Sequence, residues 1–173
     1  MRLPWTREKI PDHIRESVEF APGEIVRAAG QVQDAGYAVA TDMALHLLLT
    51  VSDEDRQDLR IGWDLVDNVT WSPPALALEL RRDRDSAPEQ LVLEIDQRSN
   101  LPAVVRNRVM DSIVVNDKIE YGRSWIRIIA RKIFETGELE WRVVPGPGLD
   151  PASPDVADAI DTQLRQARLQ WEM

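Results

Sequence analysis

The stretch that decides the fold is Tyr37-Ala-Val-Ala-Thr-Asp-Met-Ala-Leu-His-Leu47, with Ile61-Gly-Trp-Asp-Leu-Val-Asp-Asn-Val-Thr-Trp71 a little further along the chain. In the first segment two apolar runs flank Thr41-Asp42-Met43, and Asp favours tight turns. We therefore predict a β-hairpin with strands over 36–41 and 44–51. The second segment predicts a strand over 59–63, a turn over 64–68 and another strand over 69–72.

Strands are predicted on both sides of this stretch as well. From Glu24 to Val32 apolar and polar residues alternate, and Gln33-Asp34-Ala35 then forms a turn. The segments 76–81 and 90–96 show the same alternation and are joined by a charged loop. A succession of about seven short strands with turns between them favours an antiparallel sheet.

Helical patterns flank the strands. Ile10, Ile14 and Val18 recur at helical spacing and predict a short helix over 10–20. Asn100 is a good N-cap residue, and Pro102 in the first turn fits a helix that continues to about Val115. After the linker 145–148, Ser153 and Pro154 begin a terminal helix. One face of that helix carries Val156, Ile160, Leu164, Ala167 and Trp171.

In their order these elements resemble bacterial pleckstrin-homology-like (PH-like) domains. Such domains pair a V-x-T-D-x-x-L hairpin, here Val39 to Leu45, with an I-x-W-x-x-I-x-x-V segment, here Ile61 to Val69. The resemblance implies a strongly bent barrel or sandwich whose end is covered by the helix over 100–115. Members of the wider fold that bind phosphoinositides use basic residues between the first two strands. Because the loop 33–35 has no Lys or Arg, the resemblance does not imply head-group binding by that route.

The predicted fold class is therefore α+β, with a bent antiparallel PH-like barrel or sandwich of about seven strands. We expect an N-terminal helical segment over 1–21 and a PH-like core with its capping helix over 22–115. Residues 116–173 are expected to add a β-hairpin and a C-terminal helix to the same domain. A chain of 173 residues with 43% hydrophobic residues fits one globular domain of this kind.

Composition excludes several classes of protein. The sequence contains no Cys, which rules out disulfides and thiolate chemistry. No export signal or membrane-spanning stretch is apparent, so we expect a cytoplasmic bacterial protein. The net charge is −9, and this disfavours nucleic acids and anionic lipid surfaces unless a local basic patch overcomes it.

Candidate catalytic and metal-binding residues do not form a recognisable set. His13 and His46 are too few for a zinc site, and we interpret His46 as a packed or surface residue. The acidic run Asp53, Glu54, Asp55 and Asp58 lacks the spacing of a calcium loop and is interpreted as an exposed loop. Glu94 and Asp96 share one strand face, and we interpret them as outward-facing polar residues of the strand. A catalytic role together with the basic hairpin would require that these groups converge on a concave pocket. We therefore expect no cofactor and no bound metal.

The clearest basic stretch lies over 118–142. A hairpin with strands 125–133 and 139–144 places Ile126, Ile128 and Ala130 toward the core. Its four-residue loop sets Arg131 opposite Glu140 and Arg142 opposite Ile129, and the pattern predicts that Arg127 and Arg142 are free. The candidate partner-binding residues are Lys118, Arg123, Arg127, Arg131 and Arg142.

These patterns favour a non-catalytic binding or scaffold protein that binds another protein. The alternative is that the basic hairpin binds or processes a nucleic acid or a phosphate ligand. A third hypothesis is that the terminal helix forms a homodimer. A solvated, charged sheet face with no partner remains the competing interpretation of the basic hairpin.

Overall fold

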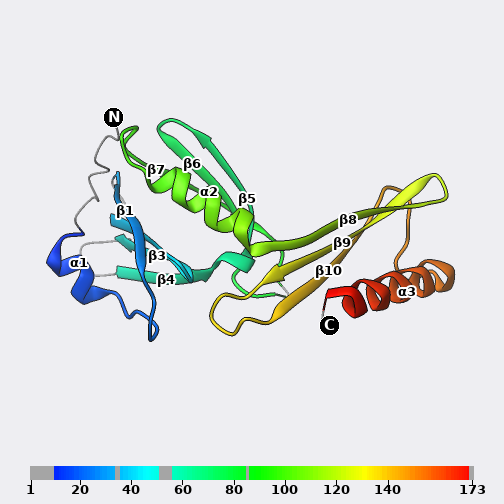
Figure 1. The fold of residues 1–173 in the computed structure, drawn as a ribbon. Coiled ribbons are helices and arrows are strands. Elements are labelled where there is room, and N and C mark those ends of the chain that lie inside the picture. Colours follow the sequence, from blue (N-terminus) through cyan, green and yellow to red (C-terminus); the bar gives the residue numbers. More distant parts are fainter. Residues whose placement is uncertain (1–9, 34–35, 51–55, 85, 172–173) are drawn as a thin grey trace, which may run out of the picture. The chain divides into compact units, whose positions relative to one another are not determined.

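The computed structural model describes residues 10–33, 36–50, 56–84 and 86–171, and within them it is an α+β protein, as predicted. Its strands form three antiparallel sheets. The chain separates into two compact units. Unit 1 contains the residues up to Ser112 together with Ile133–Thr136, and unit 2 contains Ile113–Lys132 and the residues from Gly137 onward. Figure 1 labels the elements of both units.

The first sheet of unit 1 confirms the predicted hairpin. It has the order β1-β2-β3-β4, and Val39 pairs with His46 across the hairpin. Apolar side chains of β2 and β3 are buried on both faces of the sheet, which explains their uninterrupted apolar runs. The strands are β1 (Val26–Val32), β2 (Gly36–Thr41), β3 (Ala44–Thr50) and β4 (Arg56–Gly62). Because β4 begins at Arg56, Asp58 is a strand residue and not part of an acidic loop, whereas Asp53, Glu54 and Asp55 lie outside the described residues.

The second sheet begins earlier than predicted. A 3-10 turn, η1 (Trp63–Leu65), covers only the first two residues of the expected turn over 64–68, and the following strand already starts at Val66. The side chain of Trp63 is fully buried, and its indole N–H donates to the carbonyl oxygen of Thr41 at 3.2 Å. Burial of this large side chain therefore fixes the point where the chain passes from one sheet to the other. The strands of this sheet are β5 (Val66–Ser72), β6 (Ala75–Leu80) and β7 (Glu89–Glu94).

The two sheets of unit 1 do not close into a barrel. Among the described residues, β1 and the end of β7 meet at one bridge, Val32 to Ile95. Helix α2 (Leu101–Ser112) lies against β1, β2 and β5, and it buries Leu101, Val105 and Val109 in the shared core. Of the expected barrel or sandwich, the closed barrel is therefore not formed, whereas two separate antiparallel sheets with a helix packed on them are compatible with a sandwich (Figure 1).

A second apolar cluster covers the other face of the first sheet. The predicted N-terminal helix is shorter than expected and forms α1 (Asp12–Ser17), but Ile10, Ile14 and Val18 are all buried. They pack with Ala29, Val39 and Leu48 of the sheet. The helical spacing thus identified the buried residues even though the helix covers only part of the segment.

The loop 133–136 contributes to unit 1. The guanidinium carbon of Arg108 lies 4.9 Å from the ring centroid of Phe134, within cation–π range. A guanidinium nitrogen of Arg60 lies 3.0 Å from a carboxylate oxygen of Glu135. Through these two contacts the loop packs against α2 and β4 of unit 1.

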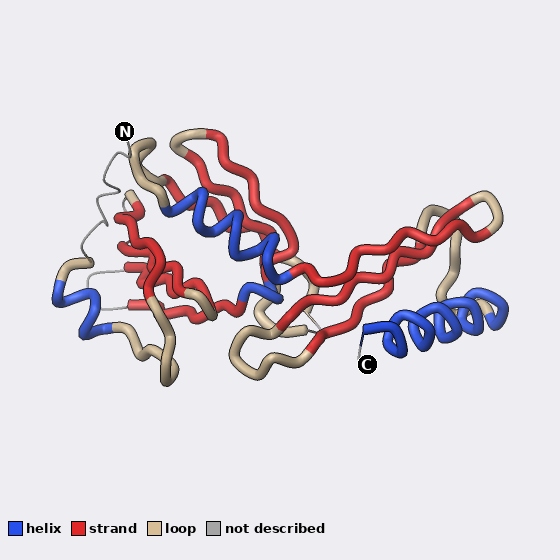
Figure 2. The backbone as a smooth tube through the Cα atoms, viewed as in Figure 1, coloured by secondary structure: helices blue, strands red, loops and turns tan. Residues whose placement is uncertain are grey.

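Unit 2 contains a strand that the sequence analysis missed. Helix α2 ends at Ser112 instead of Val115, and Ile113–Tyr121 forms β8. The β-branched run Ile113-Val114-Val115 favours a strand over a helix at this point. The sheet order is β10-β9-β8, with β9 (Ser124–Lys132) in the centre and β10 (Leu139–Pro145) at one edge (Figure 2).

Helix α3 (Pro154–Trp171) agrees with the predicted terminal helix. Val156 is buried, α3 contacts β9, and the hydroxyl of Tyr121 donates to the carbonyl oxygen of Asp155 at 3.3 Å. Before the helix, the backbone N–H of Gly146 donates to the carbonyl oxygen of Trp125 at 2.7 Å. Neither α3 nor any other described helix has the length and apolar character that a membrane span requires.

Candidate partner-binding site

The candidate site lies on the strands of unit 2, where strand alternation separates two faces. Ile126, Ile128 and Ala130 of β9 are buried, as predicted. The residues between them therefore project from the opposite face of the sheet. The β8–β9 register places Lys118 directly opposite Arg127 on that face.

Trp125 brings these two cations together. The Nζ atom of Lys118 lies 5.0 Å from the Trp125 ring centroid, and the guanidinium carbon of Arg127 lies 5.4 Å from it. Both distances are in cation–π range. We call Lys118, Trp125 and Arg127 the basic–aromatic strip. Neither cation forms an ion pair with a described residue, and the Nε atom of Arg127 is buried without a hydrogen-bond partner.

The other three predicted residues contribute differently. Arg142 is not free, because its Nη2 atom lies 3.1 Å from Oε2 of Glu140, two residues away on the same strand face. Arg131 is 5% exposed and is paired with Glu140 in the sheet register, as predicted. Arg123 lies in the turn between β8 and β9. Thus Lys118 and Arg127 lie beside each other, whereas burial of Arg131 and the ion pair of Arg142 make these two residues less accessible to an anion.

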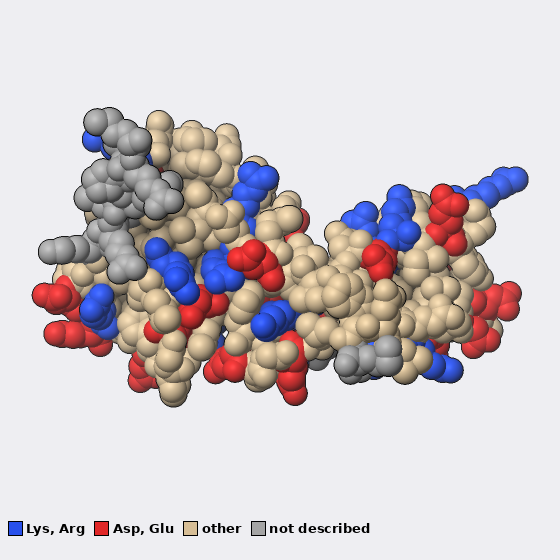
Figure 3. Space-filling model, in the orientation of Figure 1, with Lys and Arg blue, Asp and Glu red and all other residues tan. Residues whose placement is uncertain are grey.

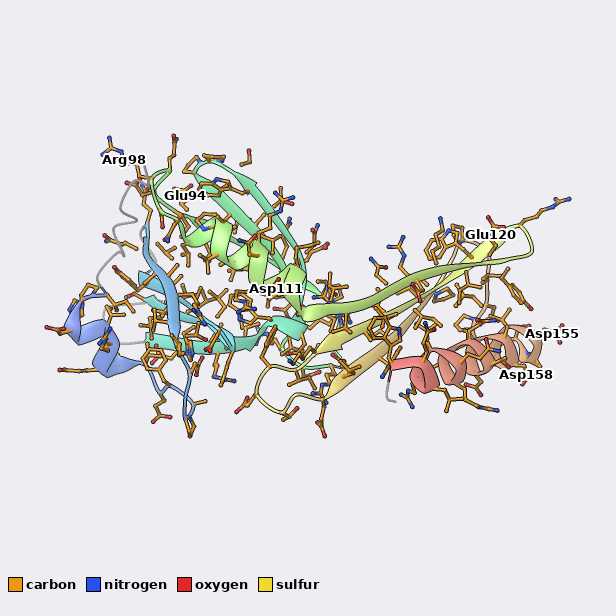
Figure 4. The ribbon with its side chains drawn as sticks, in the orientation of Figure 1. Glu94, Arg98, Asp111, Glu120, Asp155 and Asp158 are labelled. Carbon is orange, nitrogen blue, oxygen red and sulfur yellow. The ribbon has the colours of Figure 1, made fainter. Side chains whose placement is uncertain are left out.

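Acidic residues interrupt the basic surface. Glu120 pairs with Trp125 in the register and is labelled near the end of β8 in Figure 4. On the face drawn in Figure 3, basic side chains gather over the strands of unit 2 with acidic side chains among them. The strip is therefore a small cationic spot in a mixed surface rather than a continuous positive track.

Sequence reasoning did not identify Trp125 as a residue that lies beside both cations. Its spacing from Arg127 could have indicated this role, because residues two positions apart on a strand lie on the same face. Lys118 could be added only with the register of β8, the strand that the sequence did not reveal.

A second polar cluster lies inside unit 1 and centres on Glu24, whose side chain is fully buried. One carboxylate oxygen, Oε1, accepts hydrogen bonds from the hydroxyl of Thr41 and from Nε2 of His46, the latter at 2.8 Å. The other oxygen, Oε2, accepts the backbone N–H of Ala21 at 2.7 Å and lies 3.7 Å from a guanidinium nitrogen of Arg60. His46, which we interpreted as a packed or surface residue, is buried and also bound to this carboxylate.

Hydrogen bonding controls the ionisation of Glu24. Burial by itself raises the pKa of this carboxyl, but the hydrogen bonds from Thr41, His46 and Ala21 lower it by more. The net result is a pKa below the ordinary value, so the carboxylate is ionised at neutral pH. Since Glu24, Thr41 and His46 are all buried, a substrate does not reach them, and the cluster fits a structural role.

Other candidate chemistry is limited within the described part of the chain. No group of three or more His, Cys, Asp or Glu residues there is arranged to hold a metal ion. Glu94 and Asp96 do line a concave groove of about 800 Å³ in unit 1. None of the described lining residues belongs to the basic stretch 118–142, so the combination of carboxylates and basic hairpin residues that a catalytic role would require is not found in this groove.

Fold and surface together define an α+β protein made of two antiparallel β units, one of which displays a cation–aromatic spot. Comparisons with protein-family models, with curated proteins and with solved structures found no match.

Proposed function

We propose that this protein is a non-catalytic binding module whose unit 2 docks an acidic segment of a protein partner on the basic–aromatic strip. The observation that carries the proposal is that Lys118 and Arg127 both lie over Trp125 without an ion pair among the described residues. A carboxylate from a partner would form an ion pair with the guanidinium group of Arg127.

The size of the strip favours a protein over a nucleic acid. A protein that binds nucleic acid tightly neutralises several phosphates with Lys and Arg, whereas this strip offers two unpaired cations beside Glu120. The net charge of −9 opposes a polyanion further. Trp and Arg are also the residues that most often dominate the energy of protein interfaces.

For unit 1 we propose a PH-like domain that supports this binding role in the cytoplasm. Its four-stranded and three-stranded antiparallel sheets and the packing of α2 against β1, β2 and β5 support the proposal. The absence of Cys from the sequence is in keeping with a reducing compartment.

Replacing Arg127 by Ala is expected to weaken the binding of an acidic probe about tenfold or more, because interface Arg residues commonly contribute at least 1.4 kcal/mol. The probe is a fluorescein-labelled peptide of alternating Glu and Asp, and anisotropy gives the dissociation constant. Arg106→Ala, which removes an exposed Arg from α2, is the matched control and should bind like the wild type. Equal affinities for Arg127→Ala and Arg106→Ala would contradict the proposal.

The same titration with single-stranded DNA of equal charge tests the alternative. We expect weaker binding than for the peptide, with a small salt dependence because few phosphates can be contacted. Tighter binding to DNA, lost in Arg127→Ala, would instead favour the nucleic-acid hypothesis.

Homodimer formation through α3 also remains a proposal. The side chain of Trp171 is 47% exposed and continues the apolar face of the helix, and exposed Trp often marks an interface. If α3 joins two copies, Trp171→Ala should halve the mass seen by sedimentation velocity, whereas its exposed neighbour in Gln170→Ala should not change it. The same mass for the wild type and Trp171→Ala would exclude this role for Trp171.

A further inference from the structure

A polar groove lies in unit 1 where the two sheets meet. It has a volume of about 800 Å³, and its polar lining consists of Gln31, Gln33, Glu94, Asp96, Gln97 and Arg98. The groove forms beside the bridge between Val32 and Ile95, which joins the end of β1 to the end of β7. Glu94 and Arg98 are both labelled at this end of unit 1 in Figure 4.

Strand geometry explains why these polar groups share one surface. Val32 and Ile95 are 2% and 1% exposed, so both point into the core. Their neighbours along each strand, Gln31 and Gln33 on one side and Glu94 and Asp96 on the other, must then point outward. The bridge thus places two amides beside two carboxylates.

The backbone around the groove is held by hydrogen bonds. The N–H of Gln33 donates to the carbonyl oxygen of Glu94 at 2.9 Å, and the N–H of Ile95 donates to that of Pro74 at 2.8 Å. On the far side, the N–H of Arg98 donates to Oδ1 of Asp96 at 2.8 Å. The groove therefore keeps its shape without a ligand, and little ordering entropy opposes binding.

The charges in the groove select the chemistry of a ligand. Glu94 and Asp96 lie two residues apart on one side of the chain, so their Cα atoms are about 7 Å apart. Neither carboxylate forms an ion pair with a described residue, and Arg98 is the one cationic residue among the described residues of the lining. Two neighbouring carboxylates repel each other, and a cation held between them removes that repulsion.

We infer that this groove binds a ligand that carries an ammonium or guanidinium group, with Glu94 and Asp96 as the acceptors. The side-chain amides of Gln31, Gln33 and Gln97 each offer both a donor and an acceptor to the rest of a polar ligand. Such a group occurs in a free amine and in the Lys or Arg side chain of a peptide. The inference concerns unit 1 and goes beyond the function proposed for unit 2.

Isothermal titration with three probes tests the inference. The probes are 1,4-diaminobutane, the capped peptide acetyl-Lys-Ala-Arg-amide, and 1,4-butanediol as a neutral analogue of the amine. We expect binding of at least one cationic probe and none of the diol. Tighter binding of the peptide than of the diamine would identify a basic protein segment as the source, and the reverse order would identify a small amine.

Variants locate the binding. Glu94→Gln and Asp96→Asn keep the size of each side chain, and the Asn still accepts the Arg98 N–H, so the turn is preserved. Each should weaken binding about tenfold, because a hydrogen bond to a charged group is lost. Glu79→Gln removes an exposed carboxylate from β6 outside the groove and should have no effect. Failure of both cationic probes to bind at millimolar concentration, or unchanged affinity in Glu94→Gln, would overturn the inference.

Discussion

Replacement of Gly36 by Ala is expected to destabilise the protein by at least about 3 kcal/mol, which is a large part of the stability of an ordinary domain. Gly36 has a φ of +116°, a conformation that residues with a side chain rarely adopt. A Cβ atom at this position would lie 1.8 Å from the carbonyl oxygen of Leu48. Backbone oxygen cannot move aside without breaking the pairing between β2 and β3, so strain and steric overlap add together. Urea unfolding followed by circular dichroism measures the loss.

Gly23→Ala provides the matched control. Gly23 also has a positive φ, +79°, but an added Cβ atom would meet no atom within 4 Å. Its replacement should therefore cost only the conformational strain, about 1 kcal/mol. If the two variants lost the same stability, steric overlap with Leu48 would not be the cause.

Much of unit 1 could be predicted because its strands alternate clearly and its turns carry suitable residues. The hairpin at Thr41-Asp42-Met43 is an example, since the Thr41 hydroxyl accepts the backbone N–H groups of Met43 and Ala44. The missing barrel closure was not predictable from such local patterns. Closure of a barrel would require β1 and β7 to pair along their length. Among the described residues, the two segments meet at the isolated bridge of Val32 with Ile95.

Strand β8 could not be recognised from its sequence. Its middle, Asn116-Asp117-Lys118, is polar on both faces, so the alternation that identifies a strand is lost there. By contrast, the β9–β10 register was predicted correctly, although the loop runs over 133–138 and is longer than expected, because the buried Ile126 and Ile128 fix which face of β9 turns toward the core. The same register did not reveal the ion pair of Arg142 with Glu140, which forms along one strand instead of across two.

The candidate binding residues also differ in how far they could be predicted from the sequence. Arg127 was predicted because it alternates with buried residues on its own strand. Its association with Lys118 and Trp125 required β8, and the groove at Glu94 required the contact between two separate sheets. Strand pairing within one hairpin was therefore predictable, whereas contacts between distant segments were not.

Replacing Glu24 by Ala is expected to cost about 3 kcal/mol at pH 7, because the substitution leaves two donors without their acceptor. These donors are Nε2 of His46 and the backbone N–H of Ala21, whereas the hydroxyl of Thr41 keeps the carbonyl oxygen of Ala44 at 3.0 Å as an acceptor. Glu24→Gln keeps the volume and one acceptor oxygen, so it should cost less. Urea unfolding of both variants beside the wild type gives the two free energies, and a loss in Glu24→Ala no greater than in an exposed Glu79→Ala control would contradict the structural role of the cluster.

The pH dependence of stability tests the ionised state of Glu24 directly. Its pKa in the folded protein lies below the ordinary value of 4.5, so the unfolded chain binds the proton more readily than the folded chain. The carboxylate's contribution is therefore fully present above about pH 4.5 and is lost as the pH falls through the folded-state pKa. Arg60, with a guanidinium nitrogen 3.7 Å from Oε2, remains charged throughout this range and helps to keep the carboxylate ionised. The free energy of unfolding of the wild type should exceed that of Glu24→Gln at pH 5, and the difference should shrink as the pH falls below 4.5. Parallel curves down to pH 3 would mean that Glu24 has the same proton affinity in the folded and unfolded chains, and the hydrogen bonds of Thr41, His46 and Ala21 would then not stabilise its charge.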